Sequence, residues 1–277
     1  MSSTPLENFP LVRSRNIEEV RAALARVYAK PVLVPVRGVG GFDATLNNCR
    51  VGHFELFYGT YRTAAEFDYP ETNIIAQLFP LRGKGEAVCG RTSVSLGAGA
   101  GAIVTSQAAH QISLSDDFAQ IGLRFDAHAL TEKLAAMTGA TINEPLRMDL
   151  QPNSRNPTAQ MLEQYIPLLI ETLSDAHPPF PDWWIVQTEQ LLMTLFLCGH
   201  RHNYSHLLED KVADAAPQEV RRAEEYIEAN AQQPITLEQL ADVSGVSAFS
   251  LFSAFRKHRG YSPLSFLSQV RSRLRKP

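Results

Sequence analysis

Residues 247–277 carry a cluster of cations with no acidic residue among them. Seven of the 26 Lys and Arg residues of the chain lie in this stretch, and none of its 29 Asp and Glu residues does. A one-sided distribution of this kind is typical of a surface that binds phosphate groups. We expect Arg256, Lys257 and Arg259 to meet phosphates, which fix the position of a protein on a nucleic acid without reading its sequence.

These cations belong to a predicted pair of short helices joined by a tight turn. Apolar residues recur with i, i+3, i+4 spacing on both sides of the turn, at Leu237, Leu240, Ala241, Leu251, Ala254 and Phe255. Gly245 is expected to end the first helix, and Ser247 to cap the second. The pattern predicts a helix-turn-helix, whose second helix enters the major groove of DNA. The alternative is a helical pair that packs against the rest of the chain and exposes a basic end.

The same stretch resembles the first half of the DNA-binding domain of AraC/XylS-type transcription regulators. The resemblance is carried by Ile235-Thr236-Leu237, Leu240-Ala241, Gly245-Val246-Ser247, Leu251, Phe255-Arg256, Gly260-Tyr261-Ser262-Pro263 and Phe266-Leu267. It implies that the helix after Ser247 is the recognition helix. It also implies that residues two, five and six positions later, namely Phe249, Phe252 and Ser253, contact base edges.

The candidate DNA-binding set is completed by Ser247 and Ser250. Where Arg would read guanine through two hydrogen bonds, a Phe side chain has no hydrogen-bonding group. Phe249 and Phe252 are therefore expected to touch thymine methyl groups, with weaker discrimination between bases. The alternative is that one of the two rings packs inward.

The resemblance covers only one of the two tandem helix-turn-helix units that the family's DNA-binding domain contains. Ser272 stands where the resemblance predicts a Leu in the connecting helix, and Pro277 is the last residue. We therefore expect the second unit to be missing. Half of the groove contacts would then be lost, and the affinity for a specific DNA site would be lower.

Residues 31 to about 125 are predicted to form a β-sandwich or a β-barrel. Short apolar segments separated by glycine turns are expected to be strands at 32–36, 49–61, 73–81, 86–91, 93–96, 102–104, 111–114 and 119–125. The region resembles the cupin-like jelly-roll sensor domain of the XylS-like branch. The matching positions are Phe54-Glu55-Leu56, Gly83-Lys84-Gly85, Gly101-Ala102, Leu123-Arg124-Phe125 and His128-Ala129-Leu130. The resemblance implies that the barrel binds a small effector, often an aromatic acid.

A carboxylate effector would need a cation in the pocket. Arg37, Arg50 and Arg62 are the candidates in the strand region. The alternative for each of the three is a solvated arginine at the rim of the barrel.

The sequence gives little indication of a metal-binding site or of a nucleotide-binding loop. A metal-binding cupin needs an H-x-H pair with a Glu soon after it, whereas His53 and His110 stand alone. His200-Arg201-His202 follows a predicted helix, and only a surface pair of His202 with His206 is conceivable. The loop Gly97–Gly101 lacks the lysine of a phosphate-binding loop. We therefore expect no metal, no cofactor and no enzymatic activity.

Helices are expected to follow the barrel, and the predicted fold class is α+β. They span 126–138, with Gly139 as C-cap, then 158–176 and 182–200. In the family such an antiparallel pair serves dimerisation; the alternative is that it only covers the barrel. The predicted organisation is an N-terminal segment at 1–30, the barrel at 31–140, a helical dimerisation region at 141–205, a linker at 206–217 and an incomplete helix-turn-helix domain at 218–277.

The composition is that of an ordinary globular protein, with 44% hydrophobic and 20% charged residues among 277. Three widely spaced cysteines and the lack of a signal-peptide or membrane-spanning run predict a cytoplasmic location. The expected function is transcription regulation by a homodimer that binds promoter DNA and a small effector. RNA polymerase is a further candidate partner. One alternative is a dimerising sensor that modulates a full-length partner without specific DNA binding. The other is a small-molecule enzyme on a cupin barrel.

Overall fold

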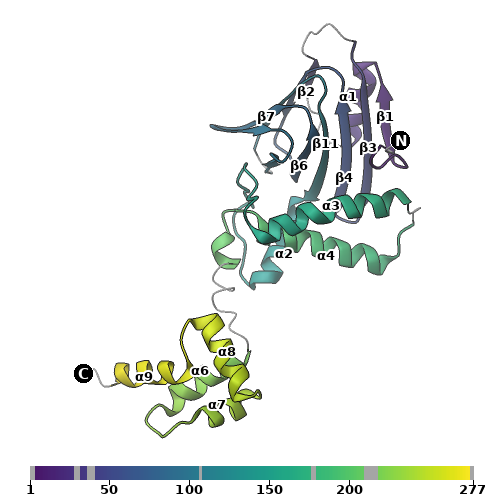
Figure 1. Ribbon diagram of the computed structural model, residues 1–277. Helices are drawn as coiled ribbons and strands as arrows, with labels where there is room; N and C mark the ends of the chain where they lie inside the picture. Colours follow the sequence, from purple (N-terminus) through teal and green to yellow (C-terminus); the bar gives the residue numbers. More distant parts are fainter. Residues whose placement is uncertain are drawn as a thin grey trace. The chain divides into compact units, whose positions relative to one another are not determined.

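The protein forms two compact units, Met1–Ser205 and His206–Pro277 (Figure 1). The structure, a computed structural model, describes residues 4–27, 32–35, 41–105, 108–175, 179–208 and 218–274. The predicted effector residue Arg37, the basic residues Arg275 and Lys276, and residues 209–217 of the predicted linker lie outside these ranges.

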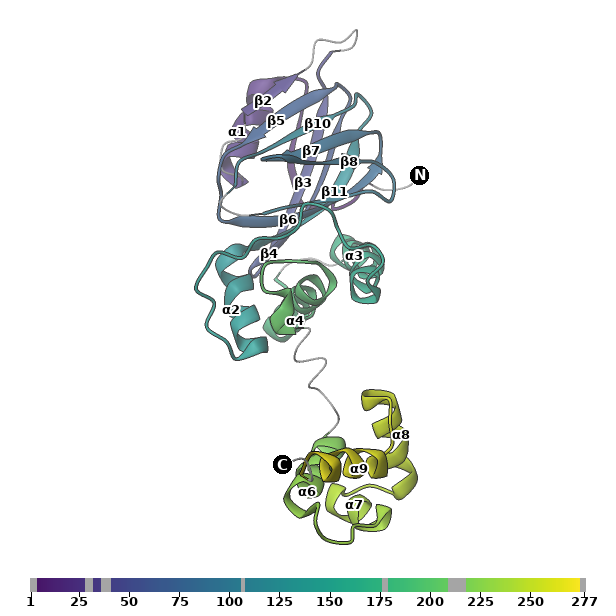
Figure 2. The same cartoon turned by 90° about the vertical axis from the view of Figure 1, so that its left-hand side faces the viewer.

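The eleven strands among the described residues of the N-terminal unit form two antiparallel sheets that face each other. The larger sheet has the order β1-β3-β4-β11-β6-β9 and the smaller has β2-β5-β10-β7-β8; in Figure 2 the smaller sheet crosses in front of the larger. The strands are β1 (Pro10–Ser14), β2 (Val32–Pro35), β3 (Ala44–Val51), β4 (Phe54–Tyr61), β5 (Ala65–Tyr69), β6 (Ile74–Arg82), β7 (Gly85–Cys89), β8 (Thr92–Leu96), β9 (Ala102–Val104), β10 (His110–Leu114) and β11 (Ala119–Asp126).

The larger sheet is buried on both of its faces. Successive side chains of a strand point to opposite faces, so each strand contributes to two different cores. Leu46, Phe57 and Leu78 belong to the core between the two sheets. Phe125 points the other way and contacts Phe196 of a covering helix, with ring centroids 5.2 Å apart. This double burial is seen in β11, where every residue from Ala119 to Phe125 is buried, including Gln120 and Arg124.

Four described helices belong to this unit: α1 (Ile17–Val27), α2 (Ala127–Thr138), α3 (Pro157–Asp175) and α4 (Asp182–Gly199). Figure 1 shows α3 and α4 side by side beneath the strands. The predicted boundaries of α2 are confirmed, because the Asp126 carboxylate caps its first turn and Gly139 ends it at φ 66°. Among the described residues, no helix is both long and apolar enough to cross a membrane.

The predicted single strand at 49–61 is wrong. Residues 44–51 and 54–61 are separate strands that pair as a hairpin, with Val51 opposite Phe54. Gly52 adopts φ 57°, a conformation that glycine tolerates best, and so allows the tight reversal. Strands β1 and β5 and helix α1 are further elements that the hydrophobic pattern does not predict.

The C-terminal unit contains α6 (Gln218–Asn230), α7 (Leu237–Ser244), α8 (Ala248–Arg259) and α9 (Pro263–Leu274). Its core includes Val220, Ile227, Leu240, Leu251, Phe255 and Phe266. Thr236 and Gln239 form a capping box at the start of α7, and Gly245 ends that helix at φ 73°. Ser247 accepts a hydrogen bond from the Ser250 amide and caps α8. The predicted helix-turn-helix is confirmed.

Candidate functional site

A pocket lies between the two sheets of the N-terminal unit. Its cavity volume is about 40 Å³, and it opens partly to solvent. Most of its lining is apolar, with four polar exceptions in Thr72, His110, Gln120 and Arg124. The apolar lining includes Phe57, Tyr69, Ile74, Ala76, Leu78, Val104 and Ile112. A concave apolar site with few polar groups is the usual form of a small-molecule binding site.

Arg124 of β11 is the cation of this pocket, and only 3% of its surface is exposed. Its Nη2 atom donates to Asn48 Oδ1 at 2.8 Å and to the Glu55 carboxylate, and Nη1 donates to the carbonyl of Val27 at 3.2 Å. The guanidinium also lies 5.2 Å from the ring centroid of Phe57. Glu55 therefore balances the charge of Arg124, and the guanidinium is held in one position.

Two further polar side chains of the pocket are neutral. The Oε1 atom of Gln120 is buried and accepts no hydrogen bond from the residues that the structure describes. His110 stacks on Tyr69 with centroids 4.7 Å apart. Burial lowers the pKa of His110, and a hydrogen bond to the carbonyl of Ala108 opposes that shift. The pocket therefore presents a hydrogen-bond acceptor and a neutral imidazole beside a charge-balanced arginine.

Gly122 makes room for the aromatic wall of the pocket. A Cβ atom at this position of β11 would overlap the ring of Phe57, which lies across the strand from it. Any other residue at position 122 would require the Phe57 ring, which lines the pocket, to move. The width of the pocket thus depends on a matched pair of residues on neighbouring strands.

The second candidate site is the exposed face of α8 in the C-terminal unit. Phe249, Phe252, Ser253 and Arg256 follow i, i+3, i+4, i+7 spacing and are all exposed, whereas Leu251 and Phe255 on the opposite face are fully buried. No Asp or Glu occurs in α8 or α9. The geometry is that of a helix-turn-helix whose second helix presents an acid-free surface.

The comparisons with known proteins identify the N-terminal unit. Residues 20–197 match the AraC-binding-like domain. The chain belongs to this family. The matched range contains every residue that lines the pocket, and it ends before α6 begins.

Two known proteins extend the comparison. The chain is 35% identical over 159 residues to the "Probable thc operon regulatory protein" of Rhodococcus erythropolis, which is 54% of this chain and 46% of that relative. The chain thus matches about half the length of this curated relative. The crystal structure of the AraC-like transcriptional activator CuxR aligns with a TM-score of 0.50 and 18% identity over 95% of this chain and 93% of that chain. The predicted α+β fold class with a cupin-like N-terminal domain is confirmed.

Two of the predicted effector arginines of this AraC-binding-like domain, Arg50 and Arg62, do not line this pocket, and Arg37 lies outside the described residues. Arg50 is exposed and reaches toward Glu55 with Nε–Oε1 at 3.7 Å, and Arg62 is exposed at the bend after β4. Neither residue lines the pocket, because both lie near strand ends. The pocket cation is Arg124, whose signal in the sequence is a basic residue flanked by Leu123 and Phe125 within a buried strand.

The predicted DNA-binding residues of the C-terminal unit fall into two groups. Ser247 and Ser250 share a hydrogen bond of 2.8 Å between their hydroxyls within the cap of α8. Arg259 forms a two-point ion pair with Glu224 of α6 at 2.7 and 2.9 Å, and both side chains are mostly buried. Phe249, Phe252, Ser253, Arg256 and Lys257 are exposed. The Arg259 guanidinium is therefore engaged in joining α6 to α8, whereas the exposed group remains available to a ligand.

The histidines at the end of α4 have structural partners. His200 Nε2 donates to Gln77 Oε1 at 2.9 Å, and His202 Nε2 donates to the Leu197 carbonyl at 3.2 Å. Burial, with a smaller contribution from His202, lowers the pKa of His200 to about 4. Within the described ranges, no three His, Cys, Asp or Glu side chains gather in a group that could hold a metal ion.

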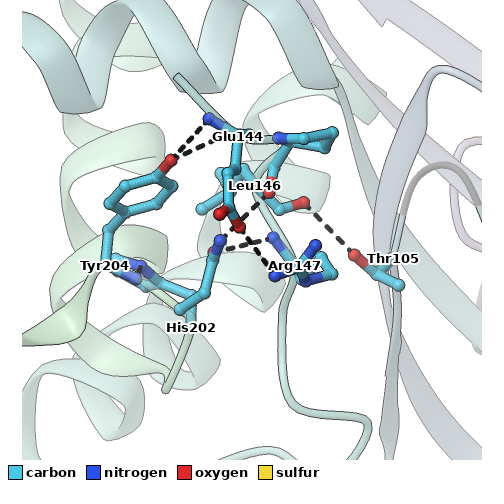
Figure 3. A network of polar contacts seen from close by, with 8 residues as sticks. Thr105, Glu144, Leu146, Arg147, His202 and Tyr204 are labelled. Carbon is cyan, nitrogen blue, oxygen red and sulfur yellow. Dashed lines mark hydrogen bonds and ion pairs between the residues drawn. The ribbon is translucent and has the colours of Figure 1, made fainter. Parts of the chain in front are cut away.

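A polar network joins the strand beside the pocket to the last residues of this unit (Figure 3). Thr105, which follows pocket residue Val104, accepts a hydrogen bond from the Met148 amide at 3.2 Å and donates to the Leu146 carbonyl at 3.4 Å. The Tyr204 hydroxyl accepts from the Glu144 amide at 2.8 Å. Residues 144–148 therefore connect β9 to residues 202–204, next to the C-terminal end of the unit.

Proposed function

We propose that this protein is a transcription regulator that binds specific DNA through α8 and binds a small effector in the pocket of its AraC-binding-like domain. The carrying observation is the exposed face of α8, which combines a helix-turn-helix position with cations and no acid. A relative described as a probable operon regulatory protein supports the proposal. Under this proposal the protein is not an enzyme, is cytoplasmic, and acts on promoters together with RNA polymerase.

DNA binding is tested by incubating the 277-residue chain with a pool of duplexes that have a randomised core and recovering the duplexes that it binds. The selected duplex and a scrambled one are then compared by fluorescence anisotropy at low and high salt. We expect a preference of at least about tenfold at high salt, since sequence-specific contacts resist salt better than phosphate contacts do. Equal binding that disappears in salt would contradict the proposal and favour the dimerising sensor.

The effector that fits this pocket best is a mainly apolar molecule with one hydrogen-bond donor for Gln120. The resemblance to XylS-like regulators implies an aromatic or other organic acid, and Arg124 is the residue that would meet its carboxylate. Glu55 already occupies the Arg124 guanidinium, however, so an acid would have to displace that carboxylate. A neutral donor needs no such exchange and gives the Gln120 carbonyl a partner.

Benzamide and benzoate separate these two effector classes, because they have nearly the same size and differ in charge. We expect benzamide to raise the thermal unfolding temperature of the chain and Gln120→Leu to abolish that shift. Thr72→Val, a second change in the pocket lining, serves as the matched control. A larger shift with benzoate than with benzamide would favour the organic acid and assign its carboxylate to Arg124.

Dimerisation is supported by apolar side chains that α3 and α4 leave in solvent. Met161 and Leu168 of α3 and Trp183, Val186 and Leu191 of α4 are all exposed. Contiguous exposed apolar surface is typical of an interface. Trp183→Lys should convert a dimer to a monomer in sedimentation experiments, and Glu171→Lys on the same helix pair is the charge control. A wild-type monomer at all accessible concentrations would contradict this part of the proposal.

Control by the effector requires that ligand affinity differ between two arrangements of the protein. The network from Val104 through Thr105 to Tyr204 supplies a physical connection that an occupied pocket could shift. Tyr204→Phe removes the hydroxyl that bonds residue 144. We expect it to reduce the effect of the ligand on DNA affinity while leaving ligand affinity within about twofold. An unchanged effect would rule out this route.

A further inference from the structure

Two phenylalanine rings lie in solvent on the same face of α8. Phe249 is 81% exposed and Phe252 is 40% exposed. They are three residues apart and therefore neighbours on the helix surface. Side chains of this kind are normally buried, so an exposed pair needs a partner to explain it.

The rings cannot turn inward, because the interior of the unit is already filled. Leu251 and Phe255 occupy the buried face of α8 with no exposed surface. The Ser247 cap and the left-handed turn at Gly245 fix where the helix begins. The exposure of Phe249 and Phe252 thus follows from the fold of the unit.

The surroundings of the rings point to a polyanion. The guanidinium of Arg256 lies 5.9 Å from the ring centroid of Phe252. Lys257 and Ser253 are exposed on the same helix, and α8 and α9 contain no acidic residue. An excess of positive charge around exposed rings favours a polyanionic partner, and the uniformly charged backbone of DNA is such a partner.

We infer that Phe249 and Phe252 recognise thymines through their 5-methyl groups in the DNA major groove. The inference rests on the proposed DNA-binding function and names what α8 reads. Phe249 is the second residue of α8, and the N-terminal residues of such a helix are those that contact base edges. Thymine is the one standard base that displays a methyl group in the major groove, and an aromatic ring contacts that methyl group well.

The experiment removes the methyl group from DNA and the ring from the protein. Two pools of randomised duplexes, one with thymine and one with uracil, are selected by the 277-residue chain. Single thymines of the selected thymine duplex are then replaced by uracil, which keeps the base pair and lacks the methyl group. We expect one or two positions to lose about fourfold in affinity each, the value for burying one methyl group. Phe249→Ala should remove the preference for thymine over uracil at one of them.

Leu264→Ala provides the matched control, since Leu264 is an exposed apolar residue of the same unit but belongs to α9. It should leave the preference for thymine unchanged. Equal affinity for thymine and uracil duplexes, with a retained preference over scrambled DNA, would overturn the inference and leave the proposed function intact. The loss of any sequence preference would overturn both. Altered sedimentation of Phe249→Ala with unchanged DNA affinity would instead assign the rings to a protein contact.

Discussion

The two units each contain an arginine that lies over a phenylalanine ring, and the two pairs behave differently. Arg124 lies 5.2 Å from the Phe57 centroid inside the barrel, and Arg256 lies 5.9 Å from the Phe252 centroid on the surface of α8. Arg124 has Glu55 and Asn48 as partners, whereas no acidic partner of Arg256 is found among the described residues. An arginine and a phenylalanine therefore form part of a buried pocket lining in the N-terminal unit. In the C-terminal unit the same two residue types form an exposed surface.

The largest expected effect concerns the buried pair. Glu55→Gln leaves the charge of Arg124 buried without its counterion, and we expect a loss of about 3 kcal/mol in the free energy of unfolding of the N-terminal unit. Urea unfolding followed by tryptophan fluorescence measures it, because both tryptophans, Trp183 and Trp184, lie in that unit. Arg50→Gln removes an exposed partner of the same Glu55 and should change stability by less than about 0.5 kcal/mol. Equal losses of unfolding free energy for Glu55→Gln and Arg50→Gln would contradict the difference drawn between the buried and the exposed arginine.

The second effect is a pH dependence confined to the N-terminal unit. His200 is neutral in the folded protein at a pKa of about 4, while the unfolded chain takes up the proton near pH 6.5. The unfolded state therefore binds more protons between these values, and stability falls as the pH falls through this window. We expect a loss of about 2 kcal/mol between pH 7 and pH 5.

His200→Gln should flatten this pH dependence when the urea midpoint is measured at both pH values. His128→Gln changes an exposed histidine of α2 and serves as the control, with the wild-type slope retained. A wild-type slope in His200→Gln would show that another group is responsible, and His110, whose pKa burial also lowers, would be the next residue to test.

The third effect distinguishes the two arginines of α8, since Arg259 forms an ion pair with Glu224 and Arg256 is exposed. Glu224→Gln removes the charge that Arg259 pairs with, and we expect a loss of about 1–2 kcal/mol in the stability of the C-terminal unit. Amide hydrogen exchange along α8 reports that loss. Glu225→Gln, on the exposed side of α6, should leave exchange unchanged. Wild-type exchange rates in Glu224→Gln would place Arg259 with the exposed cations.

The smallest effect is expected at the exposed rings. Phe249→Ala should change the stability of the C-terminal unit by less than about 0.5 kcal/mol, because the ring has few contacts to lose. Phe255→Ala, on the buried face of the same helix, should cost about 3–5 kcal/mol. Circular dichroism during urea unfolding measures both variants. A large loss in Phe249→Ala would mean that the ring supports the fold and would weaken the case for a binding role.

The sequence predicts α8 better than it predicts the pocket, and the reason is distance along the chain. The exposed face of α8 follows from i, i+3, i+4 spacing within a dozen residues. Arg124 and Glu55 are 69 positions apart and meet only because β11 pairs with β4. The hairpin at Gly52 is missed for a different reason, because the change of alternation between Val51 and Phe54 is interpreted as a small slip within one strand and not as a turn. Local periodicity identifies elements, whereas charge pairs between strands require the topology.

The pairing of Gly122 with Phe57 makes the binding pocket a candidate for redesign as a biosensor. Because the two positions share one space, a smaller residue at 57 would enlarge the pocket without disturbing the strand at 122. A second change at 122 then becomes possible, since the ring that excluded it is gone. The size of molecule that the pocket admits could thus be tuned by a pair of complementary substitutions in the N-terminal unit, without changing any residue of the C-terminal unit.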